Sequence, residues 1–222
     1  MSPNRIFLIR HGESEGNSDD NLYSSKPDYT LELTETGKQQ SVLAGAGLRA
    51  LIGAERVAFY VSPFWRTRMT FEGIASNFER SQISYREDPR LREQEWGHMR
   101  PRTEIQDILA KRTQYGAFYY RFADGESGAD VFDRVSDFLG TLMRDFEKTD
   151  FPPNVVIVTH GMALRLFLMR WFHWTVEQFE EVLNPTNCQV VLMEKATHGK
   201  YQIMTPLQTQ VVRHKYQRPV KY

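Results

Sequence analysis

The chain has 222 residues, a length that suits a single domain with a sizeable core. Its 28 lysines and arginines balance 28 aspartates and glutamates, so its net charge favours neither nucleic acid nor an anionic membrane as a partner. No apolar run approaches the ~18 residues that span a bilayer, and the run at 6–9 is too short for the core of a signal peptide. Because the single cysteine, Cys188, allows no intramolecular disulfide, we expect a cytoplasmic protein.

Strand-like and helix-like segments alternate along the chain. The runs at 6–9, 57–61 and 155–158 are almost continuously apolar, which is typical of strands buried on both faces of a sheet. This alternation predicts an α/β protein, a three-layer α/β/α sandwich around a mostly parallel mixed sheet. Helices are expected after the N-cap Thr34 and over 67–78, 127–146 and 162–172, and two later strands over 188–193 and 201–204.

We expect one domain over residues 1–207 and a basic tail over 208–222 that is either a solvated chain end or a docking segment. A cap-like excursion near 98–125 lacks strand character and is expected to cover one edge of the sheet. Its aromatic residues suit either the core or contact with a substrate; they are Phe118, Tyr119, Tyr120 and Phe122. We interpret Cys188 as a small strand residue and not as a nucleophile.

Polar residues follow three of the expected strands directly. Arg10-His11-Gly12 follows the first, a segment containing Arg66 and Arg68 the second, and Thr159-His160-Gly161 the third. Ligands of open α/β sheets bind beyond the carboxyl ends of the strands, so these side chains are expected to meet in one pocket. Clustered arginines near helix starts bind a phosphate dianion well. Taken singly, Arg66 and Arg68 could instead form surface ion pairs with Glu72 and its neighbours.

The pairing of Arg10 with His11 is expected to have a chemical purpose. Neighbouring positive charge disfavours protonation of an imidazole and lowers its pKa below the usual ~6.5. The neutral imidazole is the nucleophilic form. Arg10 is therefore expected both to attract a phosphate group and to keep His11 unprotonated.

Five segments in a fixed order resemble the histidine phosphatase superfamily, whose fold is phosphoglycerate mutase-like. They are RHGESEGN at 10–17, SPFWRTRMT at 62–70, LREQEWG at 91–97, GES at 125–127 followed by Asp130 and Arg134, and THG at 159–161. The resemblance extends over roughly residues 5 to 170. Longer stretches, including YVSPFWRTR and FYYRFADGESGADVFDRV, look like a eukaryotic subgroup of broad-specificity phosphatases.

The resemblance implies a phosphomonoester hydrolase that forms a phosphohistidine on His11, needs no metal or other cofactor, and acts on a phosphorylated small molecule. It implies Glu93 as the general acid and base, although Glu95, two residues away, stays open as an alternative. Glu13 is expected to orient pocket groups. The residues implied to bind or stabilise the phosphate are Arg10, Arg66 and His160, with Asn17 and the backbone of Gly12 and Gly161.

Two alternatives to hydrolysis are a phosphoglycerate mutase and an idle phospho-ligand-binding scaffold. The family's cofactor-dependent mutases carry a long insertion with paired arginines between the carboxylate element and GES, and here that interval is short and has no such pair. Arg100, Arg102 and Arg121 are expected either to reach a second anionic group or to be solvated. His98, His173, His198 and His214 match no catalytic segment. The physiological substrate and the oligomeric state stay open.

Overall fold

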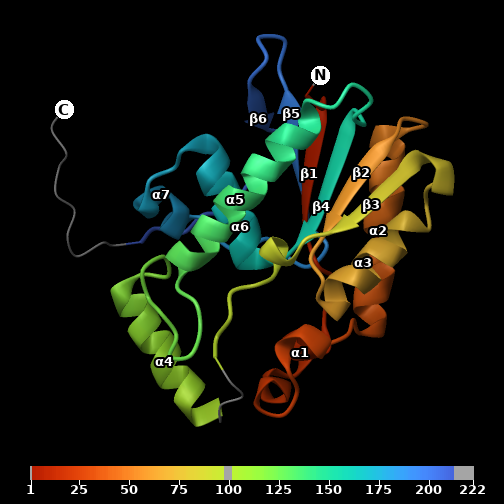
Figure 1. Ribbon diagram of the computed structural model, residues 1–222. Coiled ribbons are helices and arrows are strands. Elements are labelled where there is room, and N and C mark those ends of the chain that lie inside the picture. The colour runs from red at the N-terminus through yellow and green to blue at the C-terminus, as the bar shows by residue number, and fades with distance from the viewer. Residues whose placement is uncertain (1, 98–101, 213–222) are drawn as a thin grey trace, which may run out of the picture.

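A computed structural model describes residues 2–97 and 102–212, without the side chains of residues 102 and 103. Among these residues, six strands form one sheet in the order β3-β2-β4-β1-β5-β6 (Figure 1). Strands β1 to β4 are mutually parallel, β5 is antiparallel to β1, and β6 is antiparallel to β5. The predicted mostly parallel mixed sheet is confirmed. The strands are β1 Arg5–Arg10, β2 Val57–Val61, β3 Ile83–Glu87, β4 Asn154–Thr159, β5 Val190–Lys195 and β6 Tyr201–Ile203.

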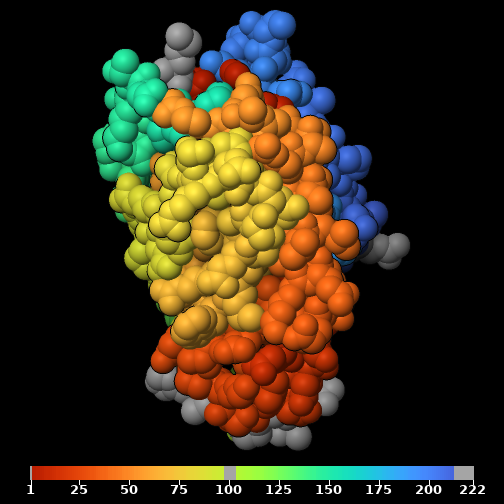
Figure 2. Space-filling model, turned by 90° about the vertical axis from the view of Figure 1, so that its right-hand side faces the viewer, coloured from red at the N-terminus to blue at the C-terminus, as the bar shows by residue number. Residues whose placement is uncertain are grey.

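Helices cover both faces of the sheet, which confirms the three-layer sandwich (Figure 1). Helices α2 and α3 pack together on one face, and α5 and α6 pack together on the other. Figure 2 views the face formed by α2, α3 and β3, with the residues of α1 at its lower end. The helices are α1 Glu15–Ser18, α2 Glu35–Ile52, α3 Trp65–Ala75, α4 Arg102–Tyr115, α5 Gly128–Phe146, α6 Gly161–Phe172 and α7 Val176–Glu181.

The two cores explain why the central strands are apolar throughout. Successive side chains of a strand point to opposite faces, so Ile6 and Leu8 of β1 join the core under α5 and α6. Phe7 and Ile9 join the core under α2 and α3. All four side chains are fully buried, and β4 divides in the same way. A buried central strand therefore has no polar face and cannot show alternation.

The structure corrects two predictions about the strands. Strand β3 was not predicted, because this edge strand reads ISYRE and exposes three of its five residues, so it lacks the apolar run that marks the central strands. Cys188 is not a strand residue: it lies in a turn with φ +55°, and β5 begins two residues later. Burial raises the pKa of the Cys188 thiol to about 12, which agrees with its interpretation as a residue that is not a nucleophile.

The described part of the excursion, residues 102–125, lies beyond the carboxyl ends of the strands and not at a lateral edge of the sheet (Figure 1). Its helix α4 contacts the short 3-10 helix η1, Asp20–Ser24, which follows α1. Two loops that are far apart in the sequence thus meet over the end of the sheet where β1, β2 and β4 finish. The division into a domain over 1–207 and a tail over 208–222 stays a prediction, and residues 213–222 lie outside the described residues.

Candidate active site

The carboxyl ends of β1, β2 and β4 bring the predicted pocket residues together. These strands are neighbours, and their ends are joined where the His11 amide donates to the Thr159 carbonyl at 2.9 Å and the Ser62 amide to the Val158 carbonyl at 3.0 Å. The imidazole rings of His11 and His160 consequently lie with their centroids 5.2 Å apart. Both side chains are buried. The prediction that these strand ends meet in one place is confirmed.

His11 is held as a neutral imidazole. Its Nδ1 lies 2.7 Å from the Gly12 carbonyl oxygen, and a carbonyl can only accept, so Nδ1 carries the proton and Nε2 keeps a lone pair. Burial, then Arg66 and Arg10, hold the pKa of His11 well below its usual value of 6.5. Gly12 is required for this loop, since a Cβ there would lie 2.6 Å from the Gly37 carbonyl oxygen.

His160 lies beside His11 with one ring nitrogen free of protein partners. Its Nε2 lies 2.8 Å from the Ser62 hydroxyl, whereas Nδ1 is buried and has no hydrogen-bond partner. Burial, then Arg66 and His11, hold the pKa of His160 well below the usual value of 6.5, so the ring is neutral. When the Ser62 hydroxyl donates to Nε2, the ring proton resides on Nδ1 and can be donated to an anion.

Arg10 and Arg66 each present a buried N–H group that no protein atom accepts. Arg10 donates from Nη1 to the Pro185 carbonyl at 2.8 Å, and its Nε is unpartnered. Arg66 is held by Asp28, which accepts from Nη1 at 2.9 Å and from Nη2 at 3.1 Å, and its Nε is likewise unpartnered. Buried donors are normally paired, so these groups, with Nδ1 of His160, mark a place built for an anion.

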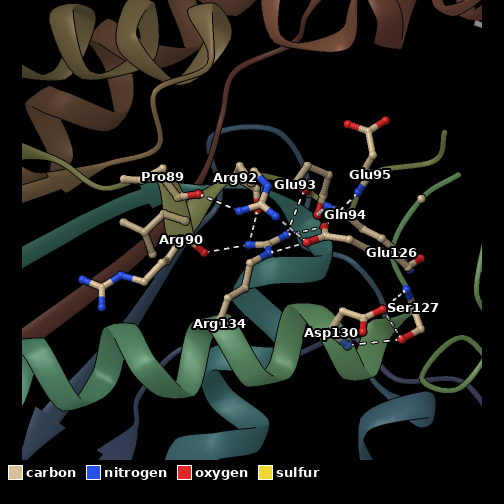
Figure 3. Close-up of polar contacts among 12 residues, drawn as sticks. Pro89, Arg90, Arg92, Glu93, Gln94, Glu95, Glu126, Ser127, Asp130 and Arg134 are labelled. Carbon is tan, nitrogen blue, oxygen red and sulfur yellow. Dashed lines mark hydrogen bonds and ion pairs between the residues drawn. The ribbon is translucent and has the colours of Figure 1, made fainter. Parts of the chain in front are cut away.

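Glu93 lies beside this cluster, and Glu95 does not. The Glu93 carboxylate accepts from the Gln94 amide at 3.0 Å and from the Met162 amide, in the first turn of α6, at 3.2 Å. Its negative charge acts on Arg10, raising the pKa that burial lowers. The Glu95 side chain is exposed and points away from the network in Figure 3. Of the two glutamates, Glu93 is therefore the one whose carboxylate lies near the clustered arginines and histidines.

Comparison with known proteins gives this arrangement a family. The model of the histidine phosphatase superfamily (branch 1) matches residues 6–205. The chain belongs to this superfamily. It is 45% identical over 216 residues to the phosphoglycerate mutase-like protein AT74 of Arabidopsis thaliana, covering 91% of this chain and 68% of that protein. It is 29% identical over 285 residues to the broad-range acid phosphatase DET1 of Saccharomyces cerevisiae, covering 86% of this chain and 85% of that protein.

A solved structure has the same fold. A mycobacterial glucosyl-3-phosphoglycerate phosphatase superposes with a TM-score of 0.72 at 19% identity, covering 92% of this chain and 99% of that one. The family membership makes this chain a phosphatase that works through a phosphohistidine, as the resemblance implied. The alternatives of a mutase and an idle scaffold are not favoured.

In this histidine phosphatase, the backbone around Glu93 is held by an arginine to which the sequence assigned no role. Arg134 of α5 donates to the carbonyls of Arg90, Arg92 and Glu93 at 2.6, 2.8 and 3.0 Å (Figure 3). Its remaining N–H groups donate to the Glu126 carboxylate, both at 2.9 Å. Glu126 also accepts from Arg92 at 2.6 Å and from the Glu95 amide at 3.0 Å. The GES segment thus positions the carboxylate segment.

Asparagines from two segments, α1 and the loop after α7, lie beside the two histidines. The Asn17 side-chain oxygen accepts from the Ser14 amide at 3.2 Å and from Nδ2 of Asn187 at 3.0 Å, and the same Nδ2 lies 3.0 Å from the His11 carbonyl. The Asn184 amide packs so closely on Gly161 that a Cβ there would lie 2.8 Å from its Cγ. Sequence reasoning missed the Asn184-Pro185-Thr186-Asn187 loop, although it follows α7 at the same end of the sheet.

Several other predicted residues have structural partners. Glu13 accepts from the Thr34 hydroxyl at 2.7 Å, so it anchors the N-terminus of α2 to the loop after β1. Arg68 pairs with Glu87 at 2.7 Å, and not with Glu72. Arg121 pairs with Asp130 at 2.6 Å on the surface, which agrees with its solvated alternative. His98, Arg100, His214 and the Arg102 side chain lie outside the described residues.

The excursion contributes both core residues and exposed ones. Phe118 and Phe122 are buried, Tyr119 is exposed and Tyr120 is half-buried. Tyr23 of η1, near the same cluster of charges, is another residue that sequence reasoning missed. Burial raises the pKa of Tyr23, and the charges of Arg66, Glu93 and Arg10 act on it.

In the described parts of the chain, no three His, Cys, Asp or Glu side chains gather to hold a metal ion, and none of the helices there has the length and apolar character needed to span a bilayer.

Proposed function

We propose that this histidine phosphatase hydrolyses phosphomonoesters of small molecules, with His11 as the nucleophile and Glu93 as the general acid and base. The observation that carries the proposal is the hydrogen bond between Nδ1 of His11 and the Gly12 carbonyl. It leaves a lone pair on Nε2 inside a pocket whose buried donors on Arg10, Arg66 and His160 have no protein acceptor.

The first half-reaction transfers the phosphoryl group to the enzyme. The Nε2 lone pair of His11 forms a bond to phosphorus, and the bond from phosphorus to the ester oxygen breaks. Glu93 enters this half-reaction as the carboxylic acid and gives its proton to that oxygen, so the alcohol leaves neutral and Glu93 becomes the carboxylate. Arg10, Arg66 and His160 donate hydrogen bonds to the phosphoryl oxygens while charge spreads over them.

The second half-reaction returns the enzyme to its starting state. Water attacks phosphorus, Glu93 takes a proton from it, and the bond between phosphorus and Nε2 breaks to release inorganic phosphate. In this proposal, Asn17 and the backbone of Gly12 and Gly161 complete the substrate site, which is supported by their position next to His11 and His160. The balanced charge of the chain supports a phosphorylated small molecule and not a nucleic acid as the partner, and the single cysteine supports a cytoplasmic location.

One set of variants tests this assignment. Labelled phosphate from the substrate should be trapped on the wild type as an acid-labile, base-stable adduct, and His11→Gln should neither form it nor release phosphate. His198→Gln, in an exposed turn, is the matched control and should behave as the wild type. An adduct on the His11→Gln variant, or equal phosphate release by it, contradicts the role of His11.

The role of Glu93 has a distinct signature. An alkoxide leaving group needs a proton, whereas p-nitrophenolate leaves without one. Glu93→Gln should therefore slow the hydrolysis of glycerol 3-phosphate by about 10²–10⁴-fold and that of p-nitrophenyl phosphate far less. Glu95→Gln should spare both substrates, and the reverse pattern would assign the proton transfer to Glu95. Conversion of 3-phosphoglycerate to 2-phosphoglycerate faster than phosphate release would restore the mutase interpretation.

A further inference from the structure

Two arginines outside the phosphate cluster lie near Glu93. They are Arg112, in the last turn of α4, and Arg165, in the second turn of α6, the helix that begins directly after His160. The charge of Glu93 acts on both guanidinium groups. In each of them Nε is buried and has no hydrogen-bond partner. The proton donor is therefore bordered by cations that the phosphoryl chemistry described above does not use.

Arg165 is rigidly anchored. Its Nη2 donates to the Phe179 carbonyl at 2.8 Å, its Nη1 donates to the Asn184 side-chain oxygen at 3.2 Å, and its guanidinium carbon lies 4.3 Å from the centroid of the Phe179 ring. The Asn184 amide in turn packs on Gly161, the residue after His160. Arg165 thus joins the α7 segment to the wall of the pocket, and its positive charge stays beside the site.

Arg112 has no such anchors. Among the described residues, its side chain makes no hydrogen bond or ion pair, although it is half-buried. The carboxylates that act on its charge are Glu180 and Glu93. Glu180 is engaged elsewhere, because it accepts from the Phe118 amide at 2.8 Å. A partly desolvated guanidinium without an acceptor is costly, and native proteins rarely keep one without a use.

Arg134 shows what a structural arginine looks like in this protein. It directs all its N–H groups to three carbonyls and the Glu126 carboxylate. Arg112 has the opposite character, since its buried Nε has no acceptor within the described chain. Arg112 and Arg165 together carry two positive charges, and the carboxylates that act on them are Glu180 and Glu93. In the proposed first half-reaction Glu93 holds the proton for the leaving oxygen and is neutral, so Glu180 supplies the single negative charge. This surplus favours an anionic ligand and disfavours a neutral one.

We propose that Arg112, with Arg165 beside it, forms a second anion subsite that binds a carboxylate or phosphate on the leaving group of the substrate. The inference rests on the proposed function, because Glu93 protonates the leaving oxygen and the atoms attached to that oxygen must extend on the side of Glu93. Arg112 lies on that side, on the helix that contacts η1 across the end of the sheet. The preferred substrates are then phosphomonoesters that carry a second anionic group.

Three substrates with the same carbon skeleton test this subsite. Glycerol 3-phosphate has a neutral leaving group, 3-phosphoglycerate adds a carboxylate, and glycerol 1,3-bisphosphate adds a phosphate. The wild type should show a higher kcat/KM for at least one of the two doubly anionic substrates, and the preferred one identifies the second anion. In Arg112→Met, the ratio of that kcat/KM to the value for glycerol 3-phosphate should fall about 10- to 150-fold, as expected for a hydrogen bond to a charged group.

Two further variants separate binding from folding. Arg112→Lys keeps the charge and should restore part of the preference, whereas Arg121→Met removes a surface arginine paired with Asp130 and should leave the ratio unchanged. The subsite is overturned if Arg112→Met slows all three substrates equally, or if the wild type hydrolyses them all without preference; the proposed phosphatase function stands in both cases. Absence of phosphate release from all three substrates and from p-nitrophenyl phosphate would overturn that function and the subsite with it.

Discussion

Replacement of Arg134 by methionine should displace Glu93, the proposed proton donor, from its position in the site. Arg134 is nearly buried, and its five N–H groups donate to the carbonyls of Arg90, Arg92 and Glu93 and to both oxygens of Glu126. Methionine fills a similar volume and accepts or donates none of these bonds. It leaves the Glu126 carboxylate, 14% exposed, with Arg92 as its remaining cationic partner. Removal of one partner of such a pair costs about 3–5 kcal/mol of the free energy of unfolding.

The same change should alter catalysis in a manner that lost stability alone does not produce. The Glu93 backbone is one of the groups that Arg134 holds, and a misplacement of about 1 Å in a catalytic group can cost about 100-fold in rate. We expect kcat for glycerol 3-phosphate to fall about 100-fold. The rate for p-nitrophenyl phosphate should fall much less, because that leaving group needs no proton. Urea denaturation measures the first effect, and steady-state phosphate release at a temperature where the variant is folded measures the second.

A matched control is present on the same helix. Arg144 of α5 is exposed and donates to the Thr141 hydroxyl at 3.0 Å, so Arg144→Met should change stability by less than about 0.5 kcal/mol and leave both rates intact. Arg134→Lys cannot reproduce the five directed bonds and should restore little. The reasoning is refuted if Arg134→Met loses less than about 1 kcal/mol, or if it slows both substrates to the same extent.

Three further outcomes follow from the same structure. Gly37→Ala should destabilise the protein by about 1–3 kcal/mol, because a Cβ there would lie 2.0 Å from the Glu13 carbonyl oxygen. Gly47→Ala, on the same helix with open space around it, should raise the free energy of unfolding by about 0.5–1 kcal/mol. Equal effects of the two changes in urea denaturation would contradict this. Buried, neutral His11 and His160 have pKa values below those of the unfolded chain, so the unfolded state binds more protons below about pH 6.5. The free energy of unfolding should therefore fall from pH 7 to pH 5, by up to about 1.4 kcal/mol per pH unit for each histidine. The same dependence of this free energy on pH in the double His→Gln variant would disprove the explanation. Asp28→Asn removes a negative charge from Arg66 and should tighten inhibition by inorganic phosphate about five-fold, roughly 1 kcal/mol, whereas weaker inhibition would show that Asp28 positions Arg66.

Local patterns in the chain were sufficient to predict the layers and the centre of the site. The continuous apolar runs of β1, β2 and β4 identify strands buried on both faces, and such strands require helices on both sides. Residues directly after parallel neighbouring strands must meet at one edge. For this reason His11, Arg66 and His160 could be placed together before any coordinates were known.

Edge and turn elements escaped prediction because their residues carry no strong local signal. Strand β3 is polar and exposed, and it is a strand only because β2 offers it a partner. Cys188 has the composition of a strand residue, yet it adopts φ +55° because its amide bonds to the Arg10 and His11 carbonyls at 3.1 and 3.3 Å. In both cases the decisive contact comes from a segment remote in the sequence.

The sequence alone determined which chemical groups are present. A histidine next to an arginine follows one strand, arginines follow a second, a histidine follows a third, and a glutamate stands in a recognisable segment. Tertiary structure decided how each group is used. The Gly12 carbonyl selects the His11 tautomer, and Arg134 and Glu126 hold the Glu93 segment. Asp28 binds one edge of the Arg66 guanidinium, and the buried Nε of Arg112 stays unpaired. Residue types and spacing record the chemical groups, whereas protonation, orientation and pairing depend on atoms that folding brings from distant parts of the chain.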